Sequence, residues 1–359
     1  MFSEMSMLNE QLKKTIDKMD RGSRIPHRSI SKTVYKNLKK VLQIDDFIID
    51  ILVEHNYSSF ETLSNATVSD LVSTGINRNT SIYLINRANY HLGNSLTAED
   101  ILAIRRGRLR ISTGSSDLDE LFSKDGVEIG SITLFMGDYG TGKTQICHQL
   151  SVMAQLRHSS GGLRGENIDS EAVIVIFIDT GGTFRPERIT SIAQDKNHDI
   201  DVSEIRTNIK VKRALSSEGM ISAIDWALER AKYENVGLIA IDSLSCFSFS
   251  DRQLEKIFNS LNKATEELEL VVAITDRVKS KQGSVTEDTC KKDPFSGHIA
   301  AERSQYVVLL KKAGGRSRKA RLVANPVYPE KDANFMITEE GIVNDISLFS
   351  GEYDGELNQ

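Results

Sequence analysis

The chain contains few cysteines and no long apolar segment, and each absence excludes a class of protein. Its cysteines, Cys147, Cys246 and Cys290, are odd in number, far apart and form no CxxC pair, so they support neither a disulfide framework nor a zinc site. No run of about 18 uncharged apolar residues occurs, which excludes a membrane-spanning helix. The longest apolar stretches lie near residues 173–178 and 270–274.

The overall composition is typical of a globular protein. Apolar residues make up 39% and charged residues 26% of the 359 residues, which argues against a largely disordered chain and against a fibrous repeat. The formal net charge of −5 is close to neutral, so any nucleic-acid binding must depend on local basic patches. The first residues have neither the apolar core nor the cleavage site of a signal peptide, and we therefore expect a cytoplasmic protein.

The amino-terminal part of the chain divides into a basic arm and a helical domain. Residues 1–40 carry ten Lys or Arg against four acids, a local charge of +6. We interpret residues 1–33 as a flexible basic arm, with a solvating tail that binds nothing as the alternative. From 34 to 92 apolar residues recur at helical spacing, and Ser59 and Thr67 are placed to cap helices. This region is predicted to be a domain of four or five helices.

The rest of the chain changes to an alternation of strands and helices. Residues 93–110 are predicted to be a linker with one basic, partly helical segment. Residues 111–359 contain short runs that are apolar at almost every position, as strands buried on both faces of a parallel sheet must be. They predict an α/β core with a doubly wound, mostly parallel sheet and ligand sites at the carboxyl ends of its strands. The predicted strands are Ile132–Met136, Val173–Ile178, Gly237–Ile241, Val271–Thr275 and Tyr306–Leu310, and the predicted helices are 144–157, 186–194, 217–233 and 252–268.

A phosphate-binding loop follows the first of these strands. Residues Gly137–Thr144 match the pattern G-x-x-x-x-G-K-[ST], in which glycines let successive backbone N–H groups point at phosphate oxygens. Lys143 is placed to reach the β- and γ-phosphates, and the Thr144 hydroxyl to hold Mg²⁺. Asp242 ends a later buried strand, where a carboxylate can orient the Mg²⁺ shell. A glycine-rich turn with a surface lysine and a capping aspartate are the alternatives.

With further motifs, this loop makes the sequence resemble the archaeal RadA branch of the RecA recombinase family. The resemblance covers nearly the whole chain, and it implies a RecA-like P-loop ATPase core behind a small, helix-hairpin-helix-like amino-terminal domain. It also implies a DNA repair and homologous recombination protein that binds ATP and single-stranded DNA and exchanges strands with double-stranded DNA. The matching motifs are Ile111–Gly114, Asp119–Leu121, Gly130–Thr133, Gly137–Leu150, Thr183–Ile189, Gly297–Ile299, Ala320–Val323 and Ile337–Ile342.

The resemblance implies roles for individual residues, with ATP and Mg²⁺ as cofactors. Lys143 and Asp242 would be catalytic, Thr144 and Asp242 would hold Mg²⁺, and Arg185 would lie near the adenine. It further implies a homo-oligomer or a co-filament with a RadA-type recombinase, associated with the nucleoid and not with a membrane. The nucleotide-binding residues would be Gly137, Asp138, Tyr139, Gly140, Thr141, Gly142, Lys143, Thr144, Gln145 and Arg185. The DNA-binding residues would be Lys279, Lys281, Lys291 and Lys292, within a loop at 279–296.

Two departures from the family pattern concern hydrolysis. Gly181 stands where the family has the glutamate that positions the attacking water, and we expect turnover to fall by about 10²–10⁴-fold in its absence. Asp179, two residues earlier, is a weaker candidate for a partial replacement. Asp276-Arg277 stands where the family has Asn-Gln, a pair that senses the γ-phosphate. An arginine can contact phosphate, but the relay to the DNA loop is altered.

Other departures concern DNA binding and assembly. The loop after Asp242 is short, because Ser245–Asp251 passes almost directly into a helix. Ser95 replaces an aromatic residue that fills a pocket on the neighbouring subunit, and Ala324 replaces an aspartate of the segment that caps the nucleotide. A second basic run flanks Gly314-Gly315, with a solvated hairpin as the alternative interpretation; its members are Lys311, Lys312, Arg316, Arg318, Lys319 and Arg321.

These features leave two functional hypotheses. The first is an active recombinase with DNA-dependent ATPase activity. The alternative is an ATP-binding paralogue with little ATPase activity, which acts as a mediator or regulator of recombinase filaments. A metabolic P-loop kinase fits neither Thr183–Ile189 nor the helical domain. The seven histidines are scattered singly, and none is assigned to catalysis or to a metal.

Overall fold

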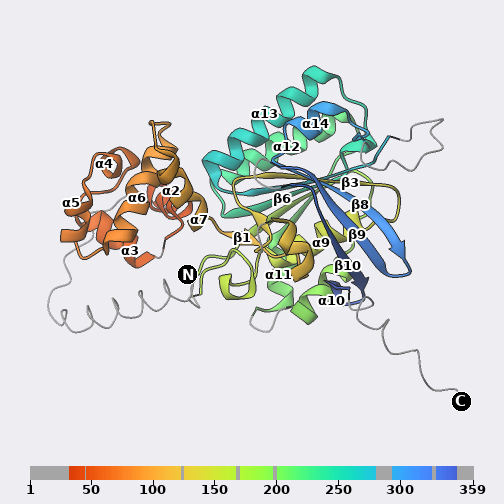
Figure 1. Cartoon of the computed structure of the whole chain (residues 1–359), viewed down its shortest axis with the longest axis horizontal. Coiled ribbons are helices and arrows are strands. Elements are labelled where there is room, and N and C mark those ends of the chain that lie inside the picture. Colours follow the sequence, from red (N-terminus) through yellow and green to blue (C-terminus); the bar gives the residue numbers. More distant parts are fainter. Residues whose placement is uncertain are drawn as a thin grey trace, which may run out of the picture.

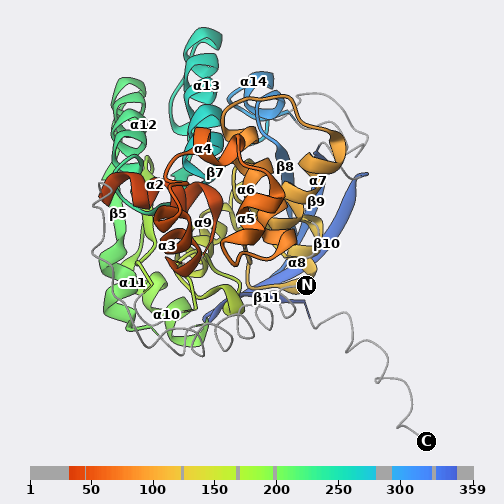
Figure 2. The ribbon, with the colours of Figure 1, turned by 90° about the vertical axis from the view of Figure 1, so that its left-hand side faces the viewer.

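The polypeptide folds into a helical amino-terminal domain and a larger α/β core, which are seen side by side in Figure 1 and one in front of the other in Figure 2. The predicted basic arm at 1–33 falls outside the described residues except for its last two, which begin the first described helix. The computed structural model describes residues 32–44, 46–122, 125–166, 170–196, 200–279, 293–325 and 329–345.

The amino-terminal domain packs its helices around a small apolar core that includes Leu52, Leu63 and Leu84. Two of its helices begin where the sequence predicts. Ser59 accepts a hydrogen bond from the backbone N–H of Thr62, and Thr67 accepts one from Asp70, each in a reciprocal capping box. The helices are α2 (Lys32–Leu42), α3 (Asp46–Glu54), α4 (Phe60–Ser64), α5 (Val68–Ser73) and α6 (Arg78–His91).

The linker predicted at 93–110 contains a regular helix and the start of a small sheet. Helix α7 (Ala98–Gly107) is capped by Thr97, and strand β1 (Arg110–Ile111) pairs antiparallel with β2 (Val127–Glu128). Figure 1 shows α7 between the helical domain and the core. The chain therefore enters the core through a structured connection.

A nine-stranded sheet organises the described part of the core. Its strand order is β11-β10-β9-β8-β3-β7-β6-β4-β5, with parallel pairing from β8 to β5 and antiparallel pairing from β8 to β11. This arrangement confirms the predicted doubly wound, mostly parallel α/β core. The strands are β3 (Ile132–Gly137), β4 (Ile174–Asp179), β5 (Ile209–Arg213), β6 (Val236–Asp242), β7 (Val271–Asp276), β8 (Tyr306–Gly314), β9 (Ser317–Ala324), β10 (Lys331–Thr338) and β11 (Gly341–Asn344).

Helices cover both faces of this sheet, so its central strands are apolar on both sides (Figure 1). In β4, Val175 and Phe177 belong to the apolar cluster on one face, whereas Ile176 and Ile178 belong to the cluster on the other. No helix in the described part of the chain is long and apolar enough to cross a membrane. The first face carries α8 (Ser116–Asp119), α9 (Lys143–Met153), α10 (Pro186–Lys196) and α11 (Val202–Asn208), and the second carries α12 (Ser217–Ala231), α13 (Asp251–Leu268) and α14 (His298–Glu302).

All five predicted strands are present, within one residue at each end except for the longer β8. Strand β5, Ile209–Arg213, escaped prediction because it lies at the edge of the sheet and exposes most of its side chains. Its sequence, Ile-Lys-Val-Lys-Arg, is accordingly polar. Strands β9 to β11 also escaped prediction, since they form an antiparallel extension with fewer buried positions than the central strands.

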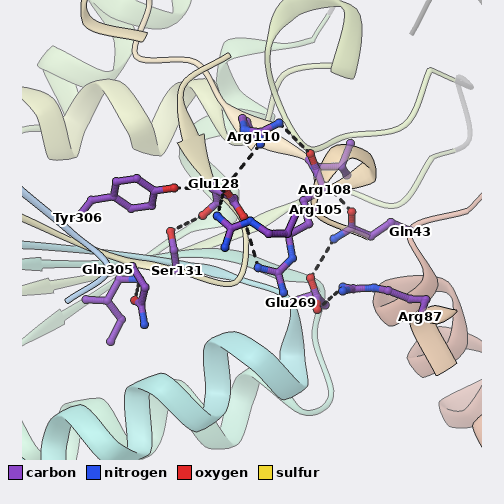
Figure 3. Close-up of polar contacts among 12 residues, drawn as sticks. Gln43, Arg87, Arg105, Arg108, Arg110, Glu128, Ser131, Glu269, Gln305 and Tyr306 are labelled. Atoms are coloured by element: carbon purple, nitrogen blue, oxygen red, sulfur yellow. Dashed lines mark hydrogen bonds and ion pairs between the residues drawn. The ribbon is translucent and has the colours of Figure 1, made fainter. Parts of the chain in front are cut away.

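Buried charges join the helical domain to the core, as Figure 3 shows. Arg87 of α6, 1% exposed, forms an ion pair with Glu269, which is 2% exposed and caps the carboxyl end of α13. The Nε of Arg87 also donates to the carbonyl oxygen of Val41. Gln43 bridges the same boundary, because its amide nitrogen donates to Glu269 at 3.0 Å and its oxygen accepts the backbone N–H of Leu109 at 3.2 Å.

A second buried carboxylate forms ion pairs with basic side chains of the linker. Glu128 is 3% exposed and forms ion pairs with Arg105, Arg108 and Arg110 at 3.3–3.6 Å. It also accepts a hydrogen bond from the hydroxyl of Tyr306 (Figure 3). Three arginines of the linker therefore form ion pairs with a buried carboxylate at the junction with the core.

We expect Arg87→Met to lower the free energy of unfolding by about 3–5 kcal/mol, because the buried Glu269 would lose the ion pair that it forms with Arg87. Lys263→Met is the matched control, since Lys263 lies on α13, is 72% exposed and, among the described residues, pairs only with the exposed Glu267. Urea unfolding followed by circular dichroism measures both variants. Equal losses of stability would contradict a specific role for the buried pair.

Candidate nucleotide-binding site

The phosphate-binding loop lies at the carboxyl end of the sheet, between β3 and α9. Strand β3 is central, and its register places Met136 beside Asp276 of β7 and Gly137 beside Leu310 of β8. A Cβ at position 137 would lie 2.5 Å from the carbonyl oxygen of Leu310, so only glycine fits there. The loop is thus held tightly by the neighbouring strands while its backbone faces the edge of the sheet where ligands bind.

Lys143 stands where the loop passes into α9, and its side chain folds back over the loop. Gly142 precedes it with a φ of +102°, which favours glycine, and α9 begins at Lys143 without a side-chain cap. The Lys143 ammonium donates to the carbonyl oxygens of Gly137 and Asp138, each at 2.8 Å. Burial lowers the pKa of Lys143, and the carboxylates of Asp242 and Asp138 oppose that shift. A cation beside the N-terminus of a helix provides the chemistry of a phosphate site.

Asp242 connects the segments that surround the loop. Its side chain ends β6 and is 4% exposed. The hydroxyls of Thr144 and Thr183 both donate to Oδ2 at 2.8 Å, and the hydroxyl of Thr275 donates to Oδ1 at 2.6 Å. Three hydroxyl donors on one buried carboxylate fix the direction in which it points.

The residues around Asp242 fit a magnesium ion that is shared with a triphosphate. The Thr144 hydroxyl and the Asp242 carboxylate are hard oxygen ligands, and Mg²⁺ characteristically takes one or two protein ligands together with substrate phosphates. Within the described residues, no group of three or more His, Cys, Asp or Glu could hold a metal ion by itself. The donor set therefore suits Mg²⁺ with a nucleotide and does not form a self-sufficient metal centre.

Position 181 lacks a carboxylate, and the nearest candidate replacement is engaged elsewhere. Asp179 ends β4, and its Oδ1 accepts the backbone N–H groups of Gly182 at 2.7 Å and Thr183 at 3.0 Å. Its Oδ2 accepts the N–H of Phe184 at 3.4 Å. Asp179 therefore shapes the turn after β4, and its contacts give no support to the interpretation that it replaces the missing glutamate.

His148 is part of the site, although none of the scattered histidines stands out in the sequence. Its Nδ1 lies 2.9 Å from the carbonyl oxygen of Thr144, and its Nε2 accepts the backbone N–H of Arg185 at 3.1 Å. Burial lowers the pKa of His148, in agreement with a neutral ring that donates through Nδ1. The ring also packs against Phe177 and Phe184. It thereby fixes the turn containing Arg185 to the helix that follows the loop.

The predicted nucleotide contacts outside the loop have partners within the protein. Arg185 is exposed, and its guanidinium donates to the carbonyl oxygens of Gly182 and Phe184. The amide oxygen of Gln145 accepts a hydrogen bond from Arg188 at 2.6 Å. Tyr139, in the loop itself, is 94% exposed. The roles of these side chains toward a nucleotide stay predictions.

The predicted DNA-binding lysines lie mostly outside the described residues. Lys281, Lys291 and Lys292 fall in the undescribed range 280–292, and Lys279 is exposed, with its backbone N–H bonded to the carbonyl oxygen of Asp293. The short connection after β6 is confirmed, because a turn of 3₁₀ helix at Leu244–Cys246 is followed by only four residues before α13.

The second basic run forms a hairpin between β8 and β9. Two of its members are neutralised, because Lys319 lies 2.7 Å and Arg321 2.6 Å from the carboxylate of Asp332 on β10. The Arg321 and Lys319 contacts hold the pKa of Asp332 well below its usual range. This part of the run is therefore a surface ion-pair network, in agreement with the alternative interpretation of the sequence.

Comparison with known proteins identifies relatives of the whole core. The family model described as Rad51 matches residues 104–345. A protein of Ignicoccus hospitalis named DNA repair and recombination protein RadA is 34% identical to this chain over an alignment of 306 residues, and the match covers 81% of this chain and 90% of that protein. The similarity thus extends beyond the core into the helical domain.

We expect Thr183→Val to weaken nucleotide binding in the presence of Mg²⁺ by about 10-fold, because Oδ2 of Asp242 would lose a hydroxyl donor. Binding in EDTA should change little. Thr190→Val, which removes a hydroxyl that donates to the carbonyl oxygen of Pro186 and accepts a hydrogen bond from Arg206, is the control. Titration of a fluorescent ATP analogue with and without Mg²⁺ measures both. A loss of equal size in EDTA would show that the hydroxyl does not act through the metal ligand.

Proposed function

Because the chain belongs to the Rad51 family, in its archaeal RadA branch, we propose that it binds ATP, Mg²⁺ and single-stranded DNA and acts in DNA repair by homologous recombination. The single observation that carries this proposal is the arrangement around Asp242. It places the loop lysine, the Thr144 hydroxyl and a fixed carboxylate at one edge of the sheet. Strand exchange within a recombinase filament is the activity that the family implies.

The nucleotide site supports binding through charge and backbone geometry. The N–H groups of Gly137–Thr144 would hold the phosphates, and Lys143 would neutralise the β- and γ-phosphates. Thr144 and Asp242 would hold Mg²⁺, which supplies charge stabilisation between the β- and γ-phosphates when bound. Thr183, Thr275 and His148 act on these residues, because they fix the Asp242 carboxylate and the turn beside it.

The site is poorly equipped for hydrolysis, which favours the second candidate function, an ATP-binding paralogue that mediates or regulates recombinase filaments. Gly181 offers no general base, and the carboxylate of Asp179 is bound by the turn. Ser95, which stands in place of the aromatic assembly residue, is exposed on the linker. These features support slow turnover and altered self-assembly, while the phosphate-binding loop and the proposed Mg²⁺ ligands Thr144 and Asp242 are all present.

Gly181→Glu is expected to raise DNA-stimulated ATP turnover by about 10²–10⁴-fold, since it returns a base able to position water. Among the described residues, a Cβ at 181 would meet only the Thr183 side chain, with its methyl carbon at 3.3 Å and its hydroxyl oxygen at 3.9 Å, so a small shift of Thr183 makes room for the new side chain. Gly181→Gln is the matched control, as it has the same size but no basic carboxylate. Phosphate release with and without single-stranded DNA measures the effect. Rapid DNA-stimulated turnover by the unmodified protein would contradict the paralogue function.

Lys291→Ala and Lys292→Ala should each reduce the slope of log affinity against log salt for single-stranded DNA by about one unit, because each removes one phosphate contact. Lys319→Ala is the control, since Lys319 is already paired with Asp332. Fluorescence anisotropy across a salt series provides the slopes. An unchanged slope in both variants would remove the 279–296 loop from the DNA-binding surface.

A further inference from the structure

Helix α3 of the amino-terminal domain is more apolar than its packing requires. Six of its nine residues are apolar, but only Ile49 and Leu52 are buried in the domain core. Phe47 is 43% exposed, and Ile48 and Ile51 are only partly buried. With 3.6 residues per turn, Phe47 and Ile51 fall on the side of the helix that faces away from the core. The outward face of α3 is therefore partly apolar.

Acidic residues share this outward face. Asp50 and Glu54 are exposed and lie one turn apart, three and seven residues after Phe47, on the same side of the helix. Asp50 accepts a hydrogen bond from the hydroxyl of Tyr35 at 3.2 Å. Among the described residues, no basic side chain forms an ion pair with Asp50 or Glu54. The outward face thus combines apolar side chains with two carboxylates that lack a cationic partner there.

Part of the predicted basic arm has a pattern that complements this face. In residues 5–19, which lie outside the described residues, apolar side chains recur at intervals of three or four, as on one face of a helix. The second half of this segment, from Leu12 to Met19, contains three lysines and one acid. The sequence therefore predicts an amphipathic helix with a basic carboxyl-terminal half. Its apolar residues at this spacing are Met5, Leu8, Leu12, Ile16 and Met19, and its lysines are Lys13, Lys14 and Lys18.

The arm is attached to the domain beside α3. Helix α2 begins at Lys32, and Tyr35 in its first turn is the residue that contacts Asp50 of α3. Residues 20–31 connect the predicted amphipathic helix to α2. A connection of this length can extend to about 40 Å, so it allows the predicted helix to lie along α3.

An amphipathic helix of about 15 residues is marginal in water by itself, because most of its stability comes from packing of its apolar face. Helix α7 offers another exposed apolar surface, with Ile101 39% and Leu102 40% exposed. That helix carries Arg105 and Arg106 in its last turn, which balance the two acids of its first turn. The outward face of α3, with its two carboxylates, therefore suits a basic amphipathic helix better than α7 does.

We propose that residues 5–19 form an amphipathic helix that docks on α3 of the same molecule, with its apolar side on Phe47 and Ile51 and its lysines beside Asp50 and Glu54. Docking covers the exposed apolar side chains of both helices. It also supplies the positive charges that the two carboxylates lack among the described residues. The arm is then folded back on its own domain, and its lysines are held away from other anions.

Amide hydrogen exchange of the full chain, followed by mass spectrometry, tests this docking. We expect the amides of residues 8–19 to exchange at least about 10-fold more slowly than those of an unstructured peptide, and Phe47→Ser to remove this protection. Ile16→Ser, in the arm itself, should have the same effect without touching the described domain. Leu102→Ser, which changes a similarly exposed residue of α7, is the matched control and should leave the protection intact. Unchanged exchange in α6 verifies that the domain stays folded.

Exchange of residues 8–19 as fast as in an unstructured peptide would overturn the proposal. Protection that survives both Phe47→Ser and Ile16→Ser, or that Leu102→Ser removes, would also overturn docking on α3. Protection that grows with protein concentration would show that the arm docks on a second copy of the chain. Protection that appears only after single-stranded DNA is added would show that the arm binds DNA. Either result would contradict an arm folded back on its own domain.

Discussion

The carboxylate of Asp242 is the contact on which the organisation of the site depends. It receives hydroxyls from the first turn of α9, from the turn after β4 and from β7, and it stands itself at the end of β6. Four segments that are remote in sequence are thereby held around one buried negative charge. The phosphate-binding loop, which is short and rich in glycine, is therefore held by these surrounding segments as well as by the side chain of its own Lys143.

The central part of this arrangement could be predicted from the sequence. Strands buried on both faces must be apolar at nearly every position, and a glycine-rich loop with Lys143 directly after such a strand has few other interpretations. The edge strand β5 could not be predicted in this way, since exposure removes the pattern that identifies a strand. The roles of Thr183, Thr275 and His148 were also hidden, because each depends on a contact between segments that only the fold brings together.

The sequence does not distinguish basic segments that can face a ligand from basic segments that are neutralised within the fold. Lysines and arginines in the linker and in the β8–β9 hairpin have the same appearance in the sequence. The fold gives them different surroundings. Glu128 forms ion pairs with arginines of the linker, and Asp332 forms ion pairs with two basic residues of the hairpin. Arg277 and Lys312 instead lie beside the phosphate-binding loop. Charge counted along the chain therefore says little about the charge presented to a ligand, because carboxylates that the fold brings nearby, the buried Glu128 and the exposed Asp332, neutralise part of it.

The junction between the domains lies at the opposite end of the sheet from the nucleotide site. Glu269 lies two residues before β7, the strand that Arg277 follows at its other end, and it is bound by Arg87 of the helical domain. If the two domains slid past each other, the buried charges of Arg87 and Glu269 would lose their ion pair at every intermediate position. We therefore expect the helical domain to be either docked on the core or fully detached from it, without a continuous range of intermediate orientations.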